Sequence, residues 1–413
     1  MPNVSLTPDL LAKIYEMMVY LNKNRTYTIE TPYIAFRNGS FNMETFEMEP
    51  SDPKKNVIHF LDFELEKRGE DYTSWSGAEM PVFQRFLDTS IVLEDGETPD
   101  LETQFLVQEM FGYYLTNNLL GRVSFFLYGP NGHNGKSVIC EILRMLIGTK
   151  FCTFMTIEQL TTNRFNTSSL ISKKLNVCNE ESSKFTDSAM FKTLISGEPI
   201  TAERKNKANF SFKPQTKFLF ATNDLPTFKG FSRAMMDRIV IVPMYAEFKG
   251  KQASKKDVHL FKKLIPEIPA IARWALDGAK RLVGNNYNFT ISEASRNALK
   301  AYEYENSSAV AFLVDTYEMV NMTLSHHKLG EFFIPNTSLY LDYKNWCFDN
   351  GRQAMNSLNF HKDVKNYGIE SFRRRVEGSE PMRGVYLQRK GRVYEASPLD
   401  EITDVSIQED LKI

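Results

Sequence analysis

A glycine-rich turn that ends in Gly-Lys-Ser is the feature of this sequence with the clearest chemical use. The turn follows an apolar run, residues 123–128, and precedes an amphipathic stretch, residues 138–143. Its residues are Gly129, Pro130, Asn131, Gly132, His133, Asn134, Gly135, Lys136 and Ser137. A strand, a glycine turn and a helix in this order let backbone N–H groups close on phosphates, while the helix N-terminus adds positive potential. The pattern therefore predicts a binding site for a nucleoside triphosphate.

The last two residues of the turn have separate expected roles. Lys136 should reach the β- and γ-phosphates, and the Ser137 hydroxyl should ligand Mg²⁺. Five residues separate Gly129 from Gly135, where the common pattern has about four. This leaves the shape of the turn open but keeps the Gly-Lys-Ser spacing. The alternative is a glycine-rich turn with a chance Gly-Lys-Ser, which the flanking strand and helix patterns disfavour.

Two adjacent carboxylates, Glu180 and Glu181, follow the apolar run of residues 174–179. Ligands bind at the carboxyl ends of strands in open α/β sheets, so these side chains are candidates for hydrolysis. One carboxylate could hold the Mg²⁺ hydration shell, and the other could polarise the attacking water. We expect Glu180 to join Ser137 at the metal, but the sequence does not decide which glutamate is the base. A solvated acidic loop that caps the next helix is the alternative.

A polar amide and two arginines complete the set of candidate catalytic residues. Asn223 follows the run of residues 217–222 and could hydrogen-bond the attacking water, although Asn-Asp-x-Pro is also good turn chemistry. Arg233 and Arg238 precede the apolar run of residues 239–243. An arginine there could reach the site of a neighbouring subunit and stabilise transition-state charge in trans. A local salt bridge is the alternative for Arg238.

The elements around these residues indicate an α/β domain. Residues 112–243 alternate short apolar runs with helical patterns, which is typical of a parallel sheet with crossover helices. Residues 41–109 are rich in acidic side chains and suggest a separate, mainly helical unit with a short strand pair near its start. Near the C-terminus, residues 384–388 are expected to form a hairpin with residues 392–394. A length of 413 residues fits two or three domains.

Composition limits the classes of partner. The 50 Lys and Arg residues nearly balance the 51 Asp and Glu residues, so any contact with nucleic acid must come from local basic patches. The 4 cysteines are far apart and suggest neither a disulfide framework nor a zinc site, which favours a reducing, cytoplasmic compartment. No run approaches the roughly 18 apolar residues that a membrane span needs, so no membrane partner is expected.

With these motifs in order, the sequence resembles the superfamily III helicases, and more closely their phage, plasmid and poxvirus primase-helicase branch. The motifs that carry the resemblance are residues 129–137, 179–181, 196–205, 220–226 and 237–238. The resemblance covers most of the chain and implies an α/β fold with a P-loop AAA+ ATPase core. It implies a mainly helical N-terminal domain over residues 1–110, the ATPase domain over residues 111–285, and a C-terminal winged-helix domain over residues 286–413.

The resemblance also implies roles for the residues above. ATP and Mg²⁺ would bind at Lys136 and Ser137, Glu180 and Glu181 would serve hydrolysis, Asn223 would be the sensor, and Arg238 would be the arginine finger. Many relatives have a second arginine at the position of Asp237, which leaves open whether Arg233 shares the finger role.

DNA contacts are expected in two places. In this family a β-hairpin with a basic tip lies in the central channel of a hexamer, and residues 200–212 would form it here. Its basic residues are Arg204, Lys205 and Lys207. The C-terminal candidates are Lys362, Arg373, Arg374, Arg389 and Lys390. Basic side chains in both groups could contact successive phosphates of a DNA backbone. The alternative for each group is an ordinary solvated surface.

The resulting hypothesis is an ATP-dependent replicative DNA helicase of a phage or mobile element that acts in a bacterial cytoplasm. It would form a homo-oligomeric ring, a hexamer, on single-stranded DNA, with duplex DNA as a second partner. Only about a hundred residues precede the ATPase segment, so a separate primase or initiator protein is the expected source of priming. Three alternatives stay open: an origin-binding initiator, a clamp or loader that does not unwind processively, and an ATPase that acts on protein.

Overall fold

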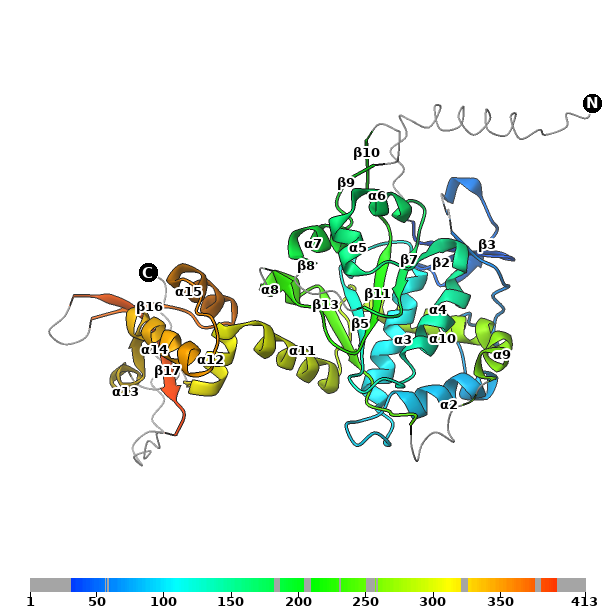
Figure 1. The fold of residues 1–413 in the computed structure, drawn as a ribbon. Coiled ribbons are helices and arrows are strands. Elements are labelled where there is room, and N and C mark those ends of the chain that lie inside the picture. The colour runs from blue at the N-terminus through cyan, green and yellow to red at the C-terminus, as the bar shows by residue number, and fades with distance from the viewer. Residues whose placement is uncertain are drawn as a thin grey trace, which may run out of the picture.

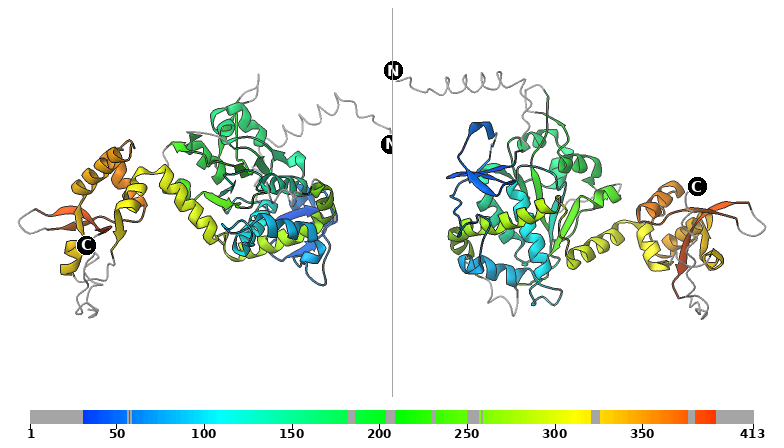
Figure 2. Two further views of the ribbon diagram at one scale, coloured as in Figure 1. Left: turned by 60° about the horizontal axis from the view of Figure 1, so that its bottom comes forward. Right: turned by 180° about the vertical axis from the view of Figure 1, so that it is seen from behind.

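The computed structural model describes residues 31–55, 57, 59–181, 186–203, 209–229, 232–249, 257, 259–320, 326–375 and 380–391. Figure 1 shows a larger α/β body and a smaller C-terminal body, joined by the helix α11 (Glu293–Asn306). The same two bodies stand apart in both views of Figure 2. Within the described ranges, every helix is too short or too polar to cross a membrane.

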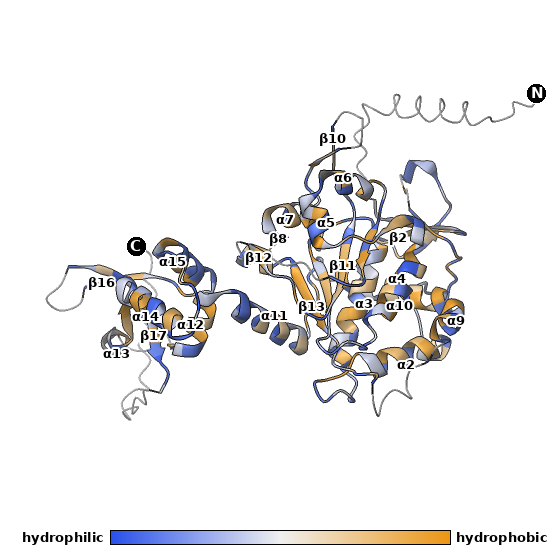
Figure 3. Ribbon diagram, viewed as in Figure 1, coloured by the Kyte–Doolittle hydropathy of each residue, from blue (hydrophilic) through white to orange (hydrophobic). Residues whose placement is uncertain are grey.

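A five-stranded parallel sheet forms the centre of the larger body. Its strands in spatial order are β13 (Ile239–Pro243), β5 (Ser124–Tyr128), β11 (Lys217–Thr222), β7 (Leu175–Cys178) and β6 (Cys152–Thr153). Nearly every residue of these strands is buried, because helices cover both faces, and β11 and β13 are among the hydrophobic segments in Figure 3. The predicted α/β class and parallel sheet are confirmed.

Side chains of β5 alternate between the two cores of this body. Phe125 and Leu127 pack into one hydrophobic cluster, and Phe126 packs into the other. Helices of the first cluster are α3 (Leu101–Leu115), α4 (Lys136–Ile147), α9 (Leu260–Leu264) and α10 (Ile268–Gly284). Helices of the second are α5 (Ile157–Thr162), α7 (Ser188–Ser196) and α8 (Arg233–Met236), and α6 (Arg164–Thr167) follows α5.

Helices α3 and α10 cross at two glycines. A β-carbon added to Gly112 would lie 2.3 Å from the backbone nitrogen of Ala279, and one added to Gly278 would lie 2.3 Å from the backbone oxygen of Gln108. Neither position has room for a methyl group. The close approach fixes the two longest helices of the larger body against each other beneath the sheet.

The N-terminal segment differs from the expectation of a mainly helical unit, which is not confirmed. Its described part contains a four-stranded sheet in the order β3-β2-β1-β4, followed by helix α2 (Pro81–Ser90) and helix α3. The strands are β1 (Tyr33–Phe36), β2 (Gly39–Asn42), β3 (Glu47–Glu49) and β4 (Phe60–Leu61). Short aromatic and apolar runs separated by tight turns favour hairpins over helices, which explains the difference.

The expected boundary at residue 110 falls inside helix α3. One hydrophobic cluster contains Ile34 and Phe41 of the N-terminal sheet together with Phe125 of the central sheet and Leu282 of α10. The described N-terminal segment therefore shares its core with the α/β body.

Two small two-stranded sheets border the larger body. In one, β9 (Ile200–Ala202) pairs antiparallel with β10 (Phe210–Phe212), as the expected hairpin over residues 200–212 requires. Its tip, with Arg204, Lys205 and Lys207, lies outside the described residues. In the other, β8 (Thr186–Asp187) pairs parallel with β12 (Phe228–Lys229).

The C-terminal body has its own hydrophobic core, which includes Phe312, Tyr343 and Phe360. Its elements are α12 (Ser308–Thr316), β14 (Tyr317–Met319), α13 (His326–Glu331), β15 (Phe333–Pro335), α14 (Asn336–Asp349), α15 (Ser357–Asn366), β16 (Phe372–Arg374) and β17 (Met382–Arg389). Strand β17 pairs antiparallel with β14, β15 and β16. Residues 384–388 thus pair with two earlier strands, β15 and β14, and only Gly384 among them also lies opposite β16. Their expected partner, residues 392–394, lies outside the described residues.

Candidate nucleotide-binding site

The glycine-rich turn lies between β5 and α4, as the sequence predicts. Helix α4 begins at Lys136, and the residue before it, Gly135, has a left-handed backbone with φ of 91°. Gly132 and His133 also have positive φ, 66° and 53°. These two consecutive left-handed residues turn the chain within the longer loop and answer the open question of its shape. A β-carbon at Gly129 would lie 2.6 Å from Oδ1 of Asn134, so the turn also needs glycine at its start.

The ammonium group of Lys136 lies inside this turn. Its Nζ donates to the backbone oxygen of Gly129 at 2.7 Å, to Oδ1 of Asn134 at 2.9 Å and to Oδ1 of Asn223 at 2.8 Å. Burial lowers the pKa of Lys136 to about 8. The lysine is therefore held by three neutral acceptors in a place where phosphate oxygens would be stronger partners.

A segment that the sequence did not single out supports the turn from outside. The Asn134 side chain donates through Nδ2 to the backbone oxygen of Ala246 at 2.7 Å, and the amide of Phe248 donates to the oxygen of His133 at 3.0 Å. Lys249 Nζ donates to the oxygen of Asn131 at 2.8 Å. These contacts continue the pairing of β13 with β5 beyond the ends of the strands. No sequence signal marks them, because all three end on a backbone oxygen, which every residue type offers.

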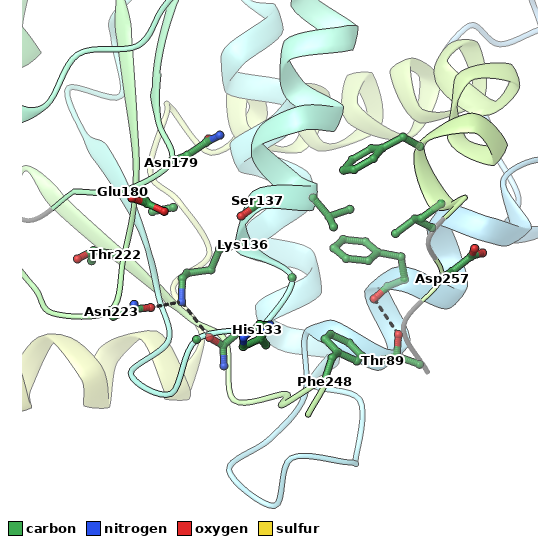
Figure 4. A pocket seen from close by; sticks show the side chains of 18 of the residues that line it. Thr89, His133, Lys136, Ser137, Asn179, Glu180, Thr222, Asn223, Phe248 and Asp257 are labelled. Atoms are coloured by element: carbon green, nitrogen blue, oxygen red, sulfur yellow. Dashed lines mark hydrogen bonds between the residues drawn. The ribbon is translucent and has the colours of Figure 1, made fainter. Parts of the chain in front are cut away.

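The two glutamates after β7 have different surroundings. Glu181 is buried, with 3% of its surface exposed, and its Oε2 accepts a hydrogen bond from the amide of Ile157 at 2.7 Å. Its backbone amide donates to the oxygen of Ala221 at 2.8 Å. Glu180 is exposed. In Figure 4 the Glu180 side chain lies among Ser137, Thr222 and Asn223 on the phosphate-loop side of the pocket.

An open cavity of about 2060 Å³ joins these groups. Its polar wall is lined by Lys136, Ser137, Glu180, Glu181 and Asn223, which come from the C-terminal ends of β5, β7 and β11 and the start of α4. Figure 4 shows the hydrogen bond from Lys136 to Asn223 that spans this wall. Hydroxyl and carboxylate oxygens at Ser137 and Glu180 are the ligand types that Mg²⁺ takes beside a triphosphate, so these residues fit the metal.

The arginines expected to act in catalysis lie elsewhere. Arg238 immediately precedes β13, and β13 runs parallel to β5 with Ile239 opposite Ser124 and Pro243 opposite Tyr128. Arg238 is therefore at the opposite end of the sheet from the turn, across five strand residues, or about 16 Å at about 3.3 Å per residue. Neither Arg233 nor Arg238 is among the described residues that line the cavity.

Local contacts hold both arginines. Arg238 donates from Nη2 to Oγ of Ser196 at 3.2 Å and from Nη1 to the backbone oxygen of Ala234 at 2.6 Å. Nε of Arg233 pairs with Oδ1 of Asp237 at 3.2 Å, and both side chains are exposed. Arg238 thus donates to a hydroxyl and a carbonyl oxygen in place of the local salt bridge considered for it, and Asp237 pairs with Arg233.

The candidate DNA-binding residues of the C-terminal body are split among three elements. Lys362 lies on α15, while Arg373 and Arg374 lie on β16 and Arg389 ends the neighbouring strand β17. Lys390 follows Arg389, whose Nη2 lies 3.9 Å from Oδ2 of Asp342. The pairing of β16 with β17 thus places arginines on adjacent strands.

A second wall of the cavity comes from elements that the sequence had not connected with the site. Helix α2 contributes Val82, Arg85, Phe86 and Thr89, and the region of α9 contributes Leu260 and Phe261. Helix α2 belongs to the segment expected to be a separate unit. Only the tertiary contact of this helix with the phosphate loop identifies its side chains as part of the site.

Comparison with known proteins finds a family model that matches part of the core, and two viral relatives. Residues 127–238 match DUF5906, a family of unknown function. A protein of Acanthamoeba polyphaga mimivirus named "Putative helicase L207/L206" is 32% identical over 142 residues, which cover 32% of this chain and 15% of that protein. A protein of Invertebrate iridescent virus 3 named "Putative helicase 121R" is 24% identical over 393 residues, which cover 87% of this chain and 39% of that protein.

Among solved structures, the apo C-terminal region of NrS-1 aligns with 76% of this chain and 76% of its own, with a TM-score of 0.46 and 14% identity. The chain spans less than half the length of the two viral relatives. It is therefore similar, over much of its length, to part of larger viral proteins that carry helicase names.

Proposed function

We propose that this chain is an ATP-dependent DNA helicase of the superfamily III type, which forms a ring and moves along single-stranded DNA. The observation that carries the proposal is the convergence of Lys136, Ser137, Glu180 and Asn223 on one cavity at the carboxyl edge of a parallel sheet. These groups can bind a triphosphate, hold a metal and orient a water. The viral relatives with helicase names support the choice of a helicase among nucleotide hydrolases.

Each polar group has a defined task in hydrolysis. Lys136 would exchange its three neutral acceptors for the β- and γ-phosphate oxygens, and Asn223, released from the lysine, would orient the attacking water. Mg²⁺, bound through Ser137 and Glu180, would supply charge stabilisation at the phosphates. The exposed Glu180 carboxylate faces the cavity and is therefore the better placed of the two glutamates to act in hydrolysis. Glu181, with its carboxylate on the amide of Ile157, would fix the strand end from which Glu180 projects.

The place of Arg238, at the opposite end of the sheet from its own phosphate loop, supports the proposal of a ring. Because the length of β13 separates them, the Arg238 side chain cannot reach a γ-phosphate bound at the phosphate loop of its own chain. Arg238 could still meet the nucleotide of a neighbouring subunit, as an arginine finger in trans requires. The proposed assembly is a homohexamer, with the hairpin of residues 200–212 toward its channel. Arg233 would act with Arg238 only if its pair with Asp237 opened.

The C-terminal body is proposed to be a winged-helix domain that contacts DNA. Three of its four described helices, α12, α14 and α15, together with β17 paired to β15 and β16, support this proposal. Lys362, Arg373, Arg374, Arg389 and Lys390 would provide phosphate contacts. The bacterial host stays a prediction, since the sequence relatives are named for viruses of other hosts.

The test is unwinding of a forked DNA duplex by the full chain, with Lys136→Ala as the inactive control. The expected result is ATP-dependent strand separation and ATPase activity that single-stranded DNA stimulates. An origin-binding initiator or a clamp and loader would bind DNA and hydrolyse ATP without opening the fork, so that outcome overturns the helicase proposal. ATPase activity that single-stranded DNA does not stimulate would favour an ATPase that acts on protein.

A further inference from the structure

The cavity at the phosphate loop continues into an apolar chamber that the polar groups above do not use. The chamber is lined by Val82 and Phe86 of α2, Val138 of α4, Phe248 of the segment after β13, and Leu260 and Phe261 of α9. In Figure 4, Phe248, Thr89 and Asp257 lie on the far side of Lys136 and Ser137 from Glu180 and Asn223. The cavity thus has one polar half and one apolar half.

Two polar side chains near the apolar half, Thr89 and Asp257, already have partners, and the exposed Arg85 of α2 also lines the cavity. Thr89 donates its hydroxyl hydrogen to the backbone oxygen of Arg85 at 2.8 Å. Asp257 accepts from Lys263 Nζ at 2.7 Å through Oδ2 and from the amide of His259 at 2.9 Å through Oδ1. Beside Arg85 and the paired Asp257 and Lys263, the surface left for a ligand is that of the apolar side chains named above, which favours contact with a flat, apolar group.

The chamber touches the phosphate loop directly. A β-carbon at Gly135 would lie 3.1 Å from Cε2 of Phe86, so the Phe86 ring packs on the residue that directly precedes α4. Val138 is on the first turn of α4, two residues after Lys136. The amide of Phe248 donates to the oxygen of His133 in the same turn. A ligand with its phosphates on Lys136 would accordingly have its other end among these side chains.

Helices α2 and α9 are tied together as the two sides of this chamber. Glu267, which follows α9 in a 3-10 turn, is buried, and its two carboxylate oxygens accept from the amides of Val82 at 3.0 Å and Phe83 at 2.8 Å. Both amides belong to the first turn of α2, whose amide groups lack partners within the helix. The spacing of the chamber walls is thus set by one carboxylate at a helix N-terminus.

We propose that this chamber is the nucleobase subsite, which takes the base of a nucleoside triphosphate between the aromatic rings of α9 and of the segment after β13. The proposal rests on the proposed function, because it assumes that the turn holds phosphates. It assigns Phe248 and Phe261 to contact with the base, and Glu267 to positioning of the helix that closes the chamber. Helix α2, from the N-terminal segment, becomes part of the nucleotide site.

The experiment compares two ligands of the full chain by calorimetry: ATP, and inorganic tripolyphosphate, which has the phosphates without the base. Phe261→Ala and Phe248→Ala are each expected to weaken ATP binding by roughly tenfold, the scale of one lost aromatic contact, and to leave tripolyphosphate binding unchanged. Phe60→Ala is the matched control, because Phe60 is outside the cavity lining and has the same exposed fraction as Phe261, 40%. It should change neither affinity.

The outcomes separate the subsite from the function on which it rests. Lys136→Ala should weaken the binding of both ATP and tripolyphosphate. If the wild-type chain binds neither ligand, the nucleotide site itself is overturned. Wild-type binding of both ligands with unchanged ATP affinity in Phe261→Ala and Phe248→Ala overturns the subsite alone. An equal loss for ATP and tripolyphosphate in the two variants also overturns it, because the effect would then not depend on the base. Thermal unfolding of each variant checks that the fold is kept.

Discussion

Nζ of Lys136 donates a hydrogen bond to Oδ1 of Asn223 at 2.8 Å, although the two residues are 87 positions apart in the chain. The contact exists because β5 and β11 are neighbours in register, with Tyr128 opposite Thr222. Residues that follow the two strands emerge side by side at the same edge of the sheet. The lysine of the phosphate loop and the amide that would orient water are thus in contact before any nucleotide is bound.

This contact predicts different defects for two substitutions of Asn223. Asn223→Ala removes the group that would orient the attacking water, so kcat for ATP hydrolysis should fall by roughly 10²-fold with little change in ATP affinity. Asn223→Asp should pair with Lys136 as an ion and repel phosphate, so ATP affinity should fall as well. Steady-state kinetics and calorimetry distinguish the two. Equal kinetic defects without an affinity difference would contradict the roles given to this pair.

The lowered pKa of Lys136 predicts a pH dependence of nucleotide binding. In the nucleotide-free chain the pKa of this lysine is about 8, because the group is buried, and bound phosphates would favour the charged form. Above pH 8 the free lysine loses its proton, and binding must restore it. ATP affinity should therefore be level below pH 8 and fall above it, by at most about tenfold per pH unit.

Calorimetry in buffers of different ionisation enthalpy should detect this proton uptake above pH 8. Lys136→Arg is the control, since a guanidinium keeps its charge throughout this range. If the wild-type chain and Lys136→Arg show the same fall in ATP affinity with pH, the lysine is not the titrating group.

The different surroundings of the two glutamates predict different effects of the same change. Glu180→Gln should lower kcat by on the order of 10³-fold and leave the free energy of unfolding unchanged, because Glu180 is exposed to the cavity. Glu181→Gln should lower the free energy of unfolding by about 2 kcal/mol, because the charged acceptor of the Ile157 amide is lost. Hydrolysis rates and denaturant unfolding would test this, and a reversed pattern would exchange the two roles.

The separation of Arg238 from its own phosphate loop predicts complementation between inactive subunits. Lys136→Ala and Arg238→Ala should each abolish hydrolysis in a ring. Co-expressed in equal amounts, they should recover about a quarter of the wild-type rate, because a random arrangement pairs an intact lysine with a neighbour's intact arginine at one interface in about four. Ser196→Ala removes the hydroxyl that accepts from Arg238 and serves as a control for local structure. Absence of recovery in mixed oligomers would argue against a finger in trans.

The close crossing of α3 and α10 predicts a large stability effect from a single methyl group. Gly112→Ala should lower the free energy of unfolding by about 3 kcal/mol, because a β-carbon there would lie 2.3 Å from the backbone of Ala279 and both helices are packed. Gly284 is the last residue of the partner helix α10, and a β-carbon there would have no atom within 4 Å. Gly284→Ala should therefore change the free energy of unfolding by less than about 1 kcal/mol. Urea unfolding of the two variants gives the comparison.

Local patterns in the sequence were enough to predict the phosphate loop. A strand, a glycine turn and a helix are close in the chain, so residues 123–143 contain the signals for their own structure. The same is true of the apolar runs of β7, β11 and β13, which predicted a parallel sheet. Short aromatic runs in residues 33–49 were less informative, because hairpin formation there depends on pairing between strands and not on a helical or strand period alone.

The sequence by itself determined which residues are candidates for the chemistry: Lys136 and Ser137 in their turn, and Asn223 at a strand end. Only the tertiary structure decided that Glu180 faces the cavity while Glu181 supports α5, and that Arg238 lies at the far end of the sheet. It also brought α2 and α9 together as an apolar chamber beside the loop. The physical reason is that these relationships depend on strand order and helix packing, which join residues far apart in the chain and leave no periodic signal in any local stretch.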